Sequence, residues 1–232
     1  MLDARVVKAR APFTIDVSLQ VPRGASCGLF GASGAGKSTI LACIAGAETP
    51  DGGTIELDGR RLYPPAIPLH ERSLGYLTQD AALFPHLRVG ENICFGLAPP
   101  QRRLRSAWID ELIERLDLGT LWNASVRAIS GGQARRVALA RMLAPKPPLV
   151  LLDEPFTGLD RHLVRELLAA IAGWQRELGF TLVVVDHDAD ILARLAPRVL
   201  AIEAGRTVQD GAWEAIRAHP ATPLLERLLA PL

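Results

Sequence analysis

Alternating apolar and polar residues mark the first third of the chain as β-structure. Residues 13–21 carry an apolar side chain at every second position, which predicts a half-buried strand. Residues 54–57 and 60–62 are short runs joined by Asp58-Gly59. Because Asp-Gly supplies the positive φ angles of a tight two-residue turn, these two runs predict a hairpin.

Continuous apolar runs predict a second kind of strand, one that is buried on both faces. Three such runs occupy residues 26–30, 149–152 and 181–185, and residues 198–202 indicate a further strand. The first run leads through a glycine-rich turn into a helix-like stretch over residues 37–45. The helix expected between the second and third runs carries apolar residues on one side: Leu163, Leu167, Leu168, Ile171 and Leu178. Buried runs that alternate with helices predict a parallel sheet.

Between residues 85 and 148 the strand signal fades, and apolar residues recur at helical spacing behind Ser106. These residues are Ile109, Leu112, Ile113 and Leu116. The pattern predicts a helical subdomain. The tail, residues 212–232, is predicted to be helical in part, with interruptions at Pro220, Pro223 and Pro231.

Composition excludes several classes of protein. The 232 residues are 49% hydrophobic and 22% charged, as in a soluble globular domain, and 26 Lys+Arg against 25 Asp+Glu leave a net charge of +1. We therefore predict no nucleic-acid partner. The three dispersed cysteines indicate a reducing compartment. Since no apolar run approaches the roughly 18 to 20 residues of a membrane span, any action at a membrane is expected to need a partner.

A glycine-rich segment predicts the binding of a nucleotide phosphate. Residues 31–38 satisfy G-x-x-x-x-G-K-S between a predicted strand and a predicted helix, which disfavours a chance glycine-rich turn. Backbone N–H groups are expected to converge on phosphate oxygens, with the Lys37 ammonium at the β and γ phosphates and the Ser38 hydroxyl at Mg²⁺. The phosphate loop comprises Gly31, Ala32, Ser33, Gly34, Ala35, Gly36, Lys37, Ser38 and Thr39.

Two acids, Asp153 and Glu154, end the apolar run 149–152, and ligands of open α/β sheets bind at such strand ends. Asp153 is predicted to hold magnesium through water. Glu154 is expected to point to the opposite side of an extended chain and to orient or deprotonate an attacking water. Two acids alone are more often a turn or a helix cap, but the phosphate loop favours the catalytic interpretation.

A second anion site is predicted at the start of the helical stretch 134–143. The five residues before it, which we call the signature, are Ile129, Ser130, Gly131, Gly132 and Gln133. Ser130 is expected to cap the helix, with free N–H groups and the positive end of the helix dipole facing outward. By itself such a sequence is only a helix cap, and one nucleotide does not require two such sites.

Six short motifs occur in an order that resembles the ATP-binding-cassette ATPases, the motor subunits of ABC transporters. They are the phosphate loop, Gln79 in Leu-Thr-Gln-Asp, the signature, Asp153-Glu154, Gly158-Leu159-Asp160, and His187 after Val-Val-Val-Asp. Each motif is weak alone, but the ordered set is highly specific. The resemblance implies an α/β fold, with a P-loop NTPase parallel-sheet core, an N-terminal antiparallel β-subdomain and an inserted helical subdomain. One domain is expected over residues 1–232, with the core in 1–84 and 147–232 and the helical subdomain in 85–146.

The resemblance also implies an ATP hydrolase that binds ATP and Mg²⁺. Two copies of the chain are expected to face head to tail, each signature closing on ATP held by the other copy's phosphate loop. Implied catalytic residues are Glu154, His187 at the γ-phosphate, and Gln79, which links the metal site to a transmembrane partner. Ser38, Gln79 and Asp153 are the implied metal-site residues. Asp160 is expected to cross the dimer, and residues 130–133 to contact the nucleotide.

Some positions depart from the family's usual pattern. Ile129 stands where leucine is common, which conserves volume. Asp186 precedes His187 where a small hydroxyl residue is typical, and an adjacent carboxylate favours a protonated imidazole, so we predict an altered pH dependence of hydrolysis. Phe13 is the nearest candidate for stacking on adenine, although its alternation with Ile15 and Val17 equally suits the core.

Residues 80–87 contain Leu-Phe-Pro-His-Leu, which is similar to bacterial importer cassettes for oxyanions such as molybdate or sulfate. The resemblance implies transmembrane permease subunits, an indirect link to a periplasmic or extracellular solute-binding protein, and a peripheral place at the cytoplasmic face of the inner membrane. Thiamine and ferric-iron importers are alternatives. A non-transport cassette is disfavoured because no coiled-coil insertion, zinc module or second cassette is found in the sequence.

Overall fold

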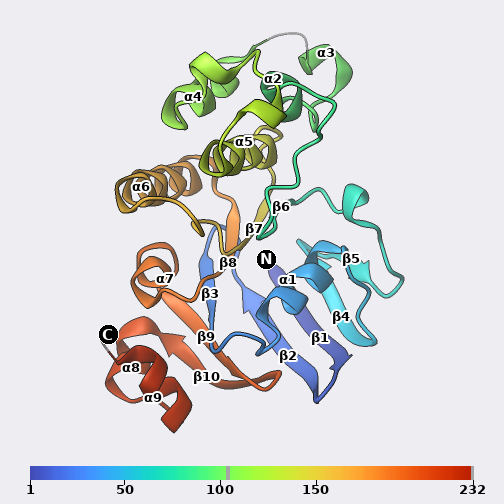
Figure 1. Cartoon of the computed structure of the whole chain (residues 1–232). Coiled ribbons are helices and arrows are strands. Elements are labelled where there is room, and N and C mark those ends of the chain that lie inside the picture. The colour runs from blue at the N-terminus through green and yellow to red at the C-terminus, as the bar shows by residue number, and fades with distance from the viewer. Residues whose placement is uncertain (103–104, 231–232) are drawn as a thin grey trace.

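Ten strands form one curled sheet in the computed structural model, which describes residues 1–102 and 105–230 (Figure 1). The strands are β1 (Leu2–Arg10), β2 (Phe13–Val21), β3 (Ser26–Phe30), β4 (Gly52–Leu57), β5 (Arg60–Tyr63), β6 (Gly75–Leu77), β7 (Leu149–Asp153), β8 (Thr181–Val185), β9 (Arg198–Glu203) and β10 (Arg206–Ala212). Their order in the sheet is β5-β4-β1-β2-β10-β9-β3-β8-β7-β6.

Helices cover the sheet and fill the chain between β6 and β7. They are α1 (Lys37–Ala45), α2 (Val89–Ile93), α3 (Pro99–Arg102), α4 (Ala107–Arg115), α5 (Gly131–Leu143), α6 (Arg161–Leu178), α7 (Ala189–Leu195), α8 (Trp213–Ala218) and α9 (Pro223–Leu229). In Figure 1, α2 to α5 lie together above the sheet. The predicted tail helices are confirmed as α8 and α9, and residues 231–232 of the tail lie outside the described residues.

The sheet has an antiparallel part and a parallel part, as predicted. Strands β5, β4, β1 and β2 pair antiparallel, and β9, β3, β8, β7 and β6 run parallel. The predicted hairpin is β4–β5, in which Asp58 and Gly59 have φ angles of 49° and 81°. Strands β1, β6 and β10 and helix α7 had not been predicted. Of these, β10 joins β2 through the pair Arg206 and Asp16 and so connects the two parts.

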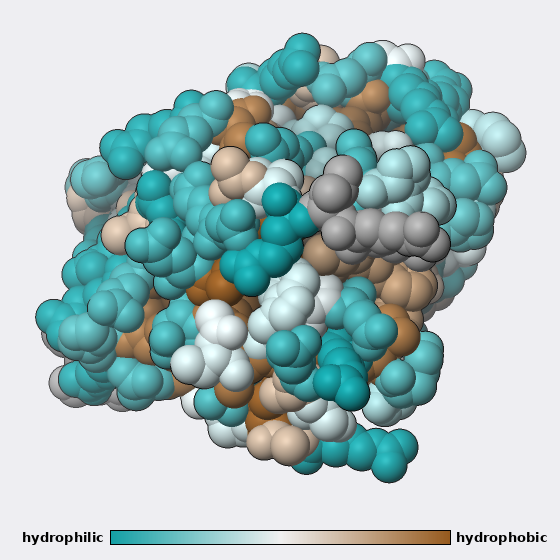
Figure 2. Space-filling model, turned by 90° about the horizontal axis from the view of Figure 1, so that it is seen from above, coloured by the Kyte–Doolittle hydropathy of each residue, from teal (hydrophilic) through white to brown (hydrophobic). Residues whose placement is uncertain are grey.

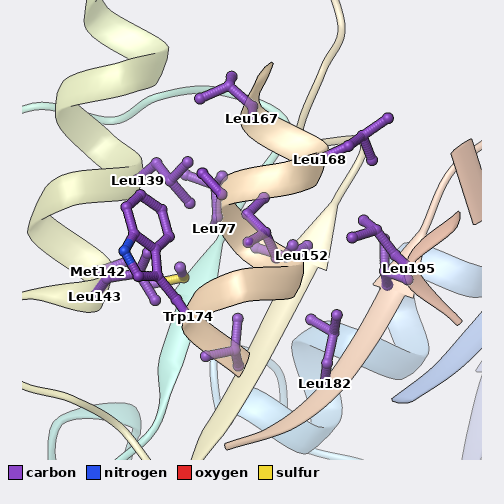
Figure 3. Close-up of a cluster of buried hydrophobic side chains, with 14 of the residues drawn as sticks. Leu77, Leu139, Met142, Leu143, Leu152, Leu167, Leu168, Trp174, Leu182 and Leu195 are labelled. Carbon is purple, nitrogen blue, oxygen red and sulfur yellow. The ribbon is translucent and has the colours of Figure 1, made fainter. Parts of the chain in front are cut away.

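Two hydrophobic clusters bury the parallel strands on both faces. Successive side chains of a strand point to opposite faces, and in β7 Leu149 and Leu151 enter one cluster while Val150 and Leu152 enter the other. The first cluster packs under α1. The second packs under α5 and α6, where Leu139, Met142 and Leu143 meet Trp174 (Figure 3). Helix α5, which begins with the signature, is therefore fixed against β6 and β7.

Figure 2 shows the molecule from above, the side on which α2 to α5 lie in Figure 1. This surface is largely hydrophilic, with small scattered hydrophobic groups. Within residues 1–102 and 105–230, no helix combines the length and apolar character needed to cross a bilayer.

Candidate functional site

The phosphate loop lies between β3 and α1, and its glycines are required by backbone geometry. Gly36 has a φ angle of 102° and caps α1. Gly31 has a φ angle of 151°, and a Cβ there would come within 2.1 Å of the Ile202 carbonyl oxygen of β9. Larger residues are excluded at both positions, so the loop keeps the close backbone approach that a phosphate cradle needs.

Lys37 turns its ammonium into this loop. Nζ donates hydrogen bonds of 2.8 Å to the carbonyl oxygens of both Gly31 and Ala32. Burial lowers the pKa of Lys37, and the nearby carboxylates of Glu154 and Asp153 oppose that shift. The positive charge of Lys37 is thus held within the phosphate loop, where an anionic phosphate would bind.

Ser38 and Asp153 place two oxygen ligands beside the loop. Ser38 Oγ donates a 2.9 Å hydrogen bond to Asp153 Oδ1. Burial raises the pKa of Asp153, while the Ser38 hydroxyl opposes this. In the described part of the chain, no three His, Cys, Asp or Glu side chains cluster as a metal cage. The pair nevertheless fits Mg²⁺, which prefers oxygen ligands and is usually bound by one or two carboxylates together with substrate phosphates.

Glu154 does not continue the extended chain, so the orientation predicted for it from strand alternation was wrong. Strand β7 ends at Asp153, and Glu154 has a φ angle of 45°. Its N–H donates to the carbonyl oxygen of Val185, and this bond of 2.9 Å ties the turn to β8. The carboxylate is therefore aimed by a left-handed turn at the strand end, not by the alternation of a strand.

This turn brings the three predicted catalytic side chains together. Glu154 Oε2 lies 3.5 Å from Gln79 Nε2 and 4.0 Å from His187 Nδ1. It also accepts a 3.2 Å hydrogen bond from the Thr157 hydroxyl. Gln79, Glu154 and His187 follow β6, β7 and β8, which are neighbours in the sheet. The carboxyl ends of adjacent parallel strands thus converge on one site.

His187 is open to solvent beside a buried acid. Its side chain is 69% exposed, and Nδ1 lies 3.6 Å from Asp186 Oδ1. Burial raises the pKa of Asp186, although its carboxylate accepts the N–H of Asp188. A cavity of about 810 Å³ between α6 and α7 reaches His187 and Gly158. The altered pH dependence inferred from this pair stays a prediction.

The signature caps α5 as predicted. Ser130 Oγ accepts the N–H of Gln133, and Gln133 Oε1 accepts the N–H of Ser130, forming a reciprocal capping box. A Cβ on Gly131 would meet nothing within 4 Å, so the helix start is open. Among the described residues, no hydrogen bond joins the signature to the phosphate loop. The two predicted anion sites are thus separate features of one chain.

Two further predicted residues have structural contacts of their own. Asp160 caps α6, accepting the N–H groups of His162 and Leu163 at 3.0 Å each, and these bonds lower its pKa. Phe13, at the start of β2, is half-buried, and its ring lies against Gly205 and close to Gly36. Phe13 therefore packs on the core and also borders the phosphate loop. Dimer contact by Asp160 and adenine stacking by Phe13 stay predictions.

Arg135 on α5 is a residue that the sequence analysis missed. The residue is 5% exposed, and its guanidinium donates to backbone carbonyls of the segments that carry Gln79 and Glu154. Burial lowers its pKa, and nearby carboxylates, Asp153 first, oppose the shift. Because an arginine in a helix is usually exposed, the sequence did not indicate that this side chain is buried at the site.

A phosphate loop between the parallel strand β3 and a helix, with an acid at the end of β7, two strands away in the same sheet, defines the P-loop NTPase fold. A family model described as "ABC transporter" matches residues 15–157. The chain belongs to this ABC transporter family.

Curated relatives have names of import systems. The chain is 44% identical over 214 residues to the Fe(3+) ions import ATP-binding protein FbpC of Pseudomonas fluorescens, covering 90% of this chain and 60% of the relative. It is 36% identical over 233 residues to the molybdenum import ATP-binding protein ModC of Rhodobacter capsulatus, covering 98% and 63%. A probable sulfate/thiosulfate import ATP-binding protein CysA of Chlorella vulgaris is 36% identical and is covered over 90% of its length. The chain thus spans about three fifths of the iron and molybdenum relatives.

Solved structures match the fold over nearly the whole chain. A dimeric ATP-binding cassette in a post-hydrolysis state, bound to ADP and Pi, is 26% identical with a TM-score of 0.78. A dimeric bacterial ABC transporter cassette gives a TM-score of 0.80 at the same identity. Each match covers 92% of this chain and 99% of the other.

Proposed function

We propose that the chain is the ATP-hydrolysing subunit of an ABC importer. One observation carries the proposal: Ser38 of the phosphate loop is hydrogen-bonded to Asp153, Lys37 turns its ammonium into the same loop, and Glu154, the residue after Asp153, lies within 4.0 Å of His187. A cation, metal-binding oxygens and a carboxylate base are the groups that phosphoryl transfer to water requires. The names of the import relatives support the same conclusion.

The proposed mechanism assigns one role to each group. Lys37 binds the β and γ phosphates, and Glu154 accepts a proton from the attacking water. Gln79 and His187 border the same space, where His187 would contact the γ-phosphate. Ser38 and Asp153, with Gln79, would hold Mg²⁺, which neutralises phosphate charge when bound.

We propose that two copies of the chain form the complete site. The start of α5 is open at Gly131, and no hydrogen bond among the described residues joins the signature to its own phosphate loop, so the signature would be free to bind the triphosphate of another copy. Asp160 at the start of α6 is the proposed crossing point. The matched solved structures are described as dimeric, which supports this arrangement.

The proposed partners are permease subunits of the membrane, which the segment 80–87 after Gln79 would contact from the cytoplasmic face, and through them a solute-binding protein. Molybdate or another oxyanion is the proposed solute, supported by the molybdenum relative that aligns with 98% of this chain. Ferric iron is the second candidate, because the iron relative shares a higher identity of 44%.

Uptake measurements in cells that lack the chain test this function. Uptake of labelled molybdate, sulfate and ferric iron is measured before and after the wild-type chain or its Lys37→Ala variant is supplied. We expect loss of uptake of one of these solutes and its return with the wild type only. Unchanged uptake of all three would contradict the proposed solutes, and full rescue by Lys37→Ala would contradict ATP-driven import.

A further inference from the structure

Helix α5 carries a buried arginine whose donors are all directed at the main chain of the site. Arg135 Nε donates to Pro155 at 2.9 Å, Nη1 to Thr78 at 2.6 Å and Nη2 to Asp153 at 3.2 Å. Nη1 and Nη2 also donate to the carbonyl oxygens of Gln79 and Glu154. A guanidinium has five N–H groups, and here five backbone carbonyls accept from it.

These bonds fix the relative positions of two catalytic residues that are far apart in sequence. The side chains of Gln79 and Glu154 meet through one long hydrogen bond of 3.5 Å. Their carbonyl groups, by contrast, are both held by the planar guanidinium of Arg135. Because a guanidinium is rigid, its two sides cannot move independently. The spacing of the Gln79 and Glu154 main chains therefore depends on Arg135.

The signature lies at the start of α5, the helix that carries Arg135. Arg135 lies two residues after Gln133 and five after Ser130, roughly 8 Å along the axis at 1.5 Å per residue. Leu139, Met142 and Leu143 pack into the core, so α5 behaves as one body. Any displacement of its open N-terminus would therefore also move Arg135.

We propose that Arg135 is a positioning residue that couples occupation of the signature to the placement of Glu154 and Gln79 in the same chain. The inference rests on the proposed function, since it requires the signature to close on a nucleotide. In the dimer, the signature of one copy would contact the nucleotide held by the other copy. Helix α5 would then transmit this contact to Glu154 and Gln79 of its own chain.

Arg136 offers a matched control on the same helix. Its side chain is 12% exposed, and Nη1 donates to the carbonyl oxygens of Leu116 and Asp117 at 2.7 and 3.1 Å. It also pairs with the Asp117 carboxylate. Leu116 and Asp117 directly follow α4, and neither belongs to the segments that carry Gln79 and Glu154. Arg136→Met therefore removes a comparable arginine without touching the catalytic main chain.

The test compares steady-state ATP hydrolysis by Arg135→Met, Arg135→Lys and Arg136→Met with the wild type, below all measured melting temperatures. We expect Arg135→Met to lower kcat about a hundredfold, the cost of a displacement of about 1 Å, and to leave KM for ATP within roughly threefold. Arg135→Lys should fall between, because an ammonium has three donors without the fork. Arg136→Met should lower the melting temperature but keep kcat within about threefold.

The readout separates positioning from folding. If Arg135→Met is too unstable to purify, a kcat of Arg135→Lys at least about tenfold below wild type with unchanged KM carries the same conclusion. Wild-type kcat in the Arg135 variants, or an equal loss in Arg136→Met, would overturn the coupling alone. An inactive wild-type chain would overturn the proposed function and the coupling with it.

Discussion

Glu154→Gln should lower kcat for ATP hydrolysis by about a thousandfold, within the range that a positioned general base contributes. Glutamine keeps the shape of the side chain and its contacts to Gln79 and Thr157, but it cannot accept the proton of the attacking water. Binding of ATP needs no such acceptor, so the variant should bind Mg-ATP normally. Trapped before hydrolysis, it should accumulate as a dimer on size-exclusion chromatography with Mg-ATP.

Glu177→Gln is the matched control, because Glu177 is a half-exposed acid on α6 outside the site. It should retain wild-type kcat and show no ATP-dependent dimer. Hydrolysis by Glu154→Gln at more than about a tenth of the wild-type rate would show that another group activates water.

Lys37→Ala should abolish turnover, with a fall in kcat/KM of about a thousandfold or more as a charged donor to the phosphates is lost. The ammonium is held by the Gly31 and Ala32 carbonyls, so its loss also leaves the loop without its cation. We expect the fluorescence change on titrating a labelled ATP analogue to disappear together with hydrolysis.

Lys8→Ala is the comparison for this loss. The Lys8 side chain is also held in place, because its Nζ lies 2.8 Å from Asp51 Oδ1. Lys8 lies on β1, outside the phosphate loop. Equal activity of Lys8→Ala and the wild type is expected. Unimpaired nucleotide binding by Lys37→Ala would refute the assignment of the phosphate loop.

The elements that flank the phosphate loop were predicted from sequence because local signals define them. Strand β3 and helix α1 have the predicted bounds, since a buried apolar run, glycines with positive φ angles and a helix follow one another without a gap. Strand β10 was missed because its residues, such as Arg206 and Asp210, are polar and it pairs at the sheet's junction. Its antiparallel pairing with β9, not the pattern of its own residues, makes it a strand.

The sequence named the three side chains that the structure brings together, but it did not predict their geometry, and their catalytic roles stay predictions. Gln79, Glu154 and His187 converge because β6, β7 and β8 are adjacent in the sheet. The buried runs predicted β7 and β8, but neither β6 nor the order of the strands was predicted. The turn at Glu154 was not predicted, because a φ angle of 45° is unusual for glutamate and depends on the bond to Val185. Arg135 was missed because its acceptors are backbone carbonyls of two distant segments, which leave no mark in the sequence.

Mixing two inactive variants tests most directly whether two copies share each site. Lys37→Ala lacks a working phosphate loop and Ser130→Arg blocks the signature, so each alone should be inactive. In a head-to-tail dimer of one with the other, the intact loop of the second variant faces the intact signature of the first. We predict that an equimolar mixture regains roughly a quarter of wild-type ATPase activity, because half of randomly paired dimers are mixed and each holds one complete site. No recovery on mixing, with full activity in Ser130→Arg alone at any protein concentration, would contradict the shared site.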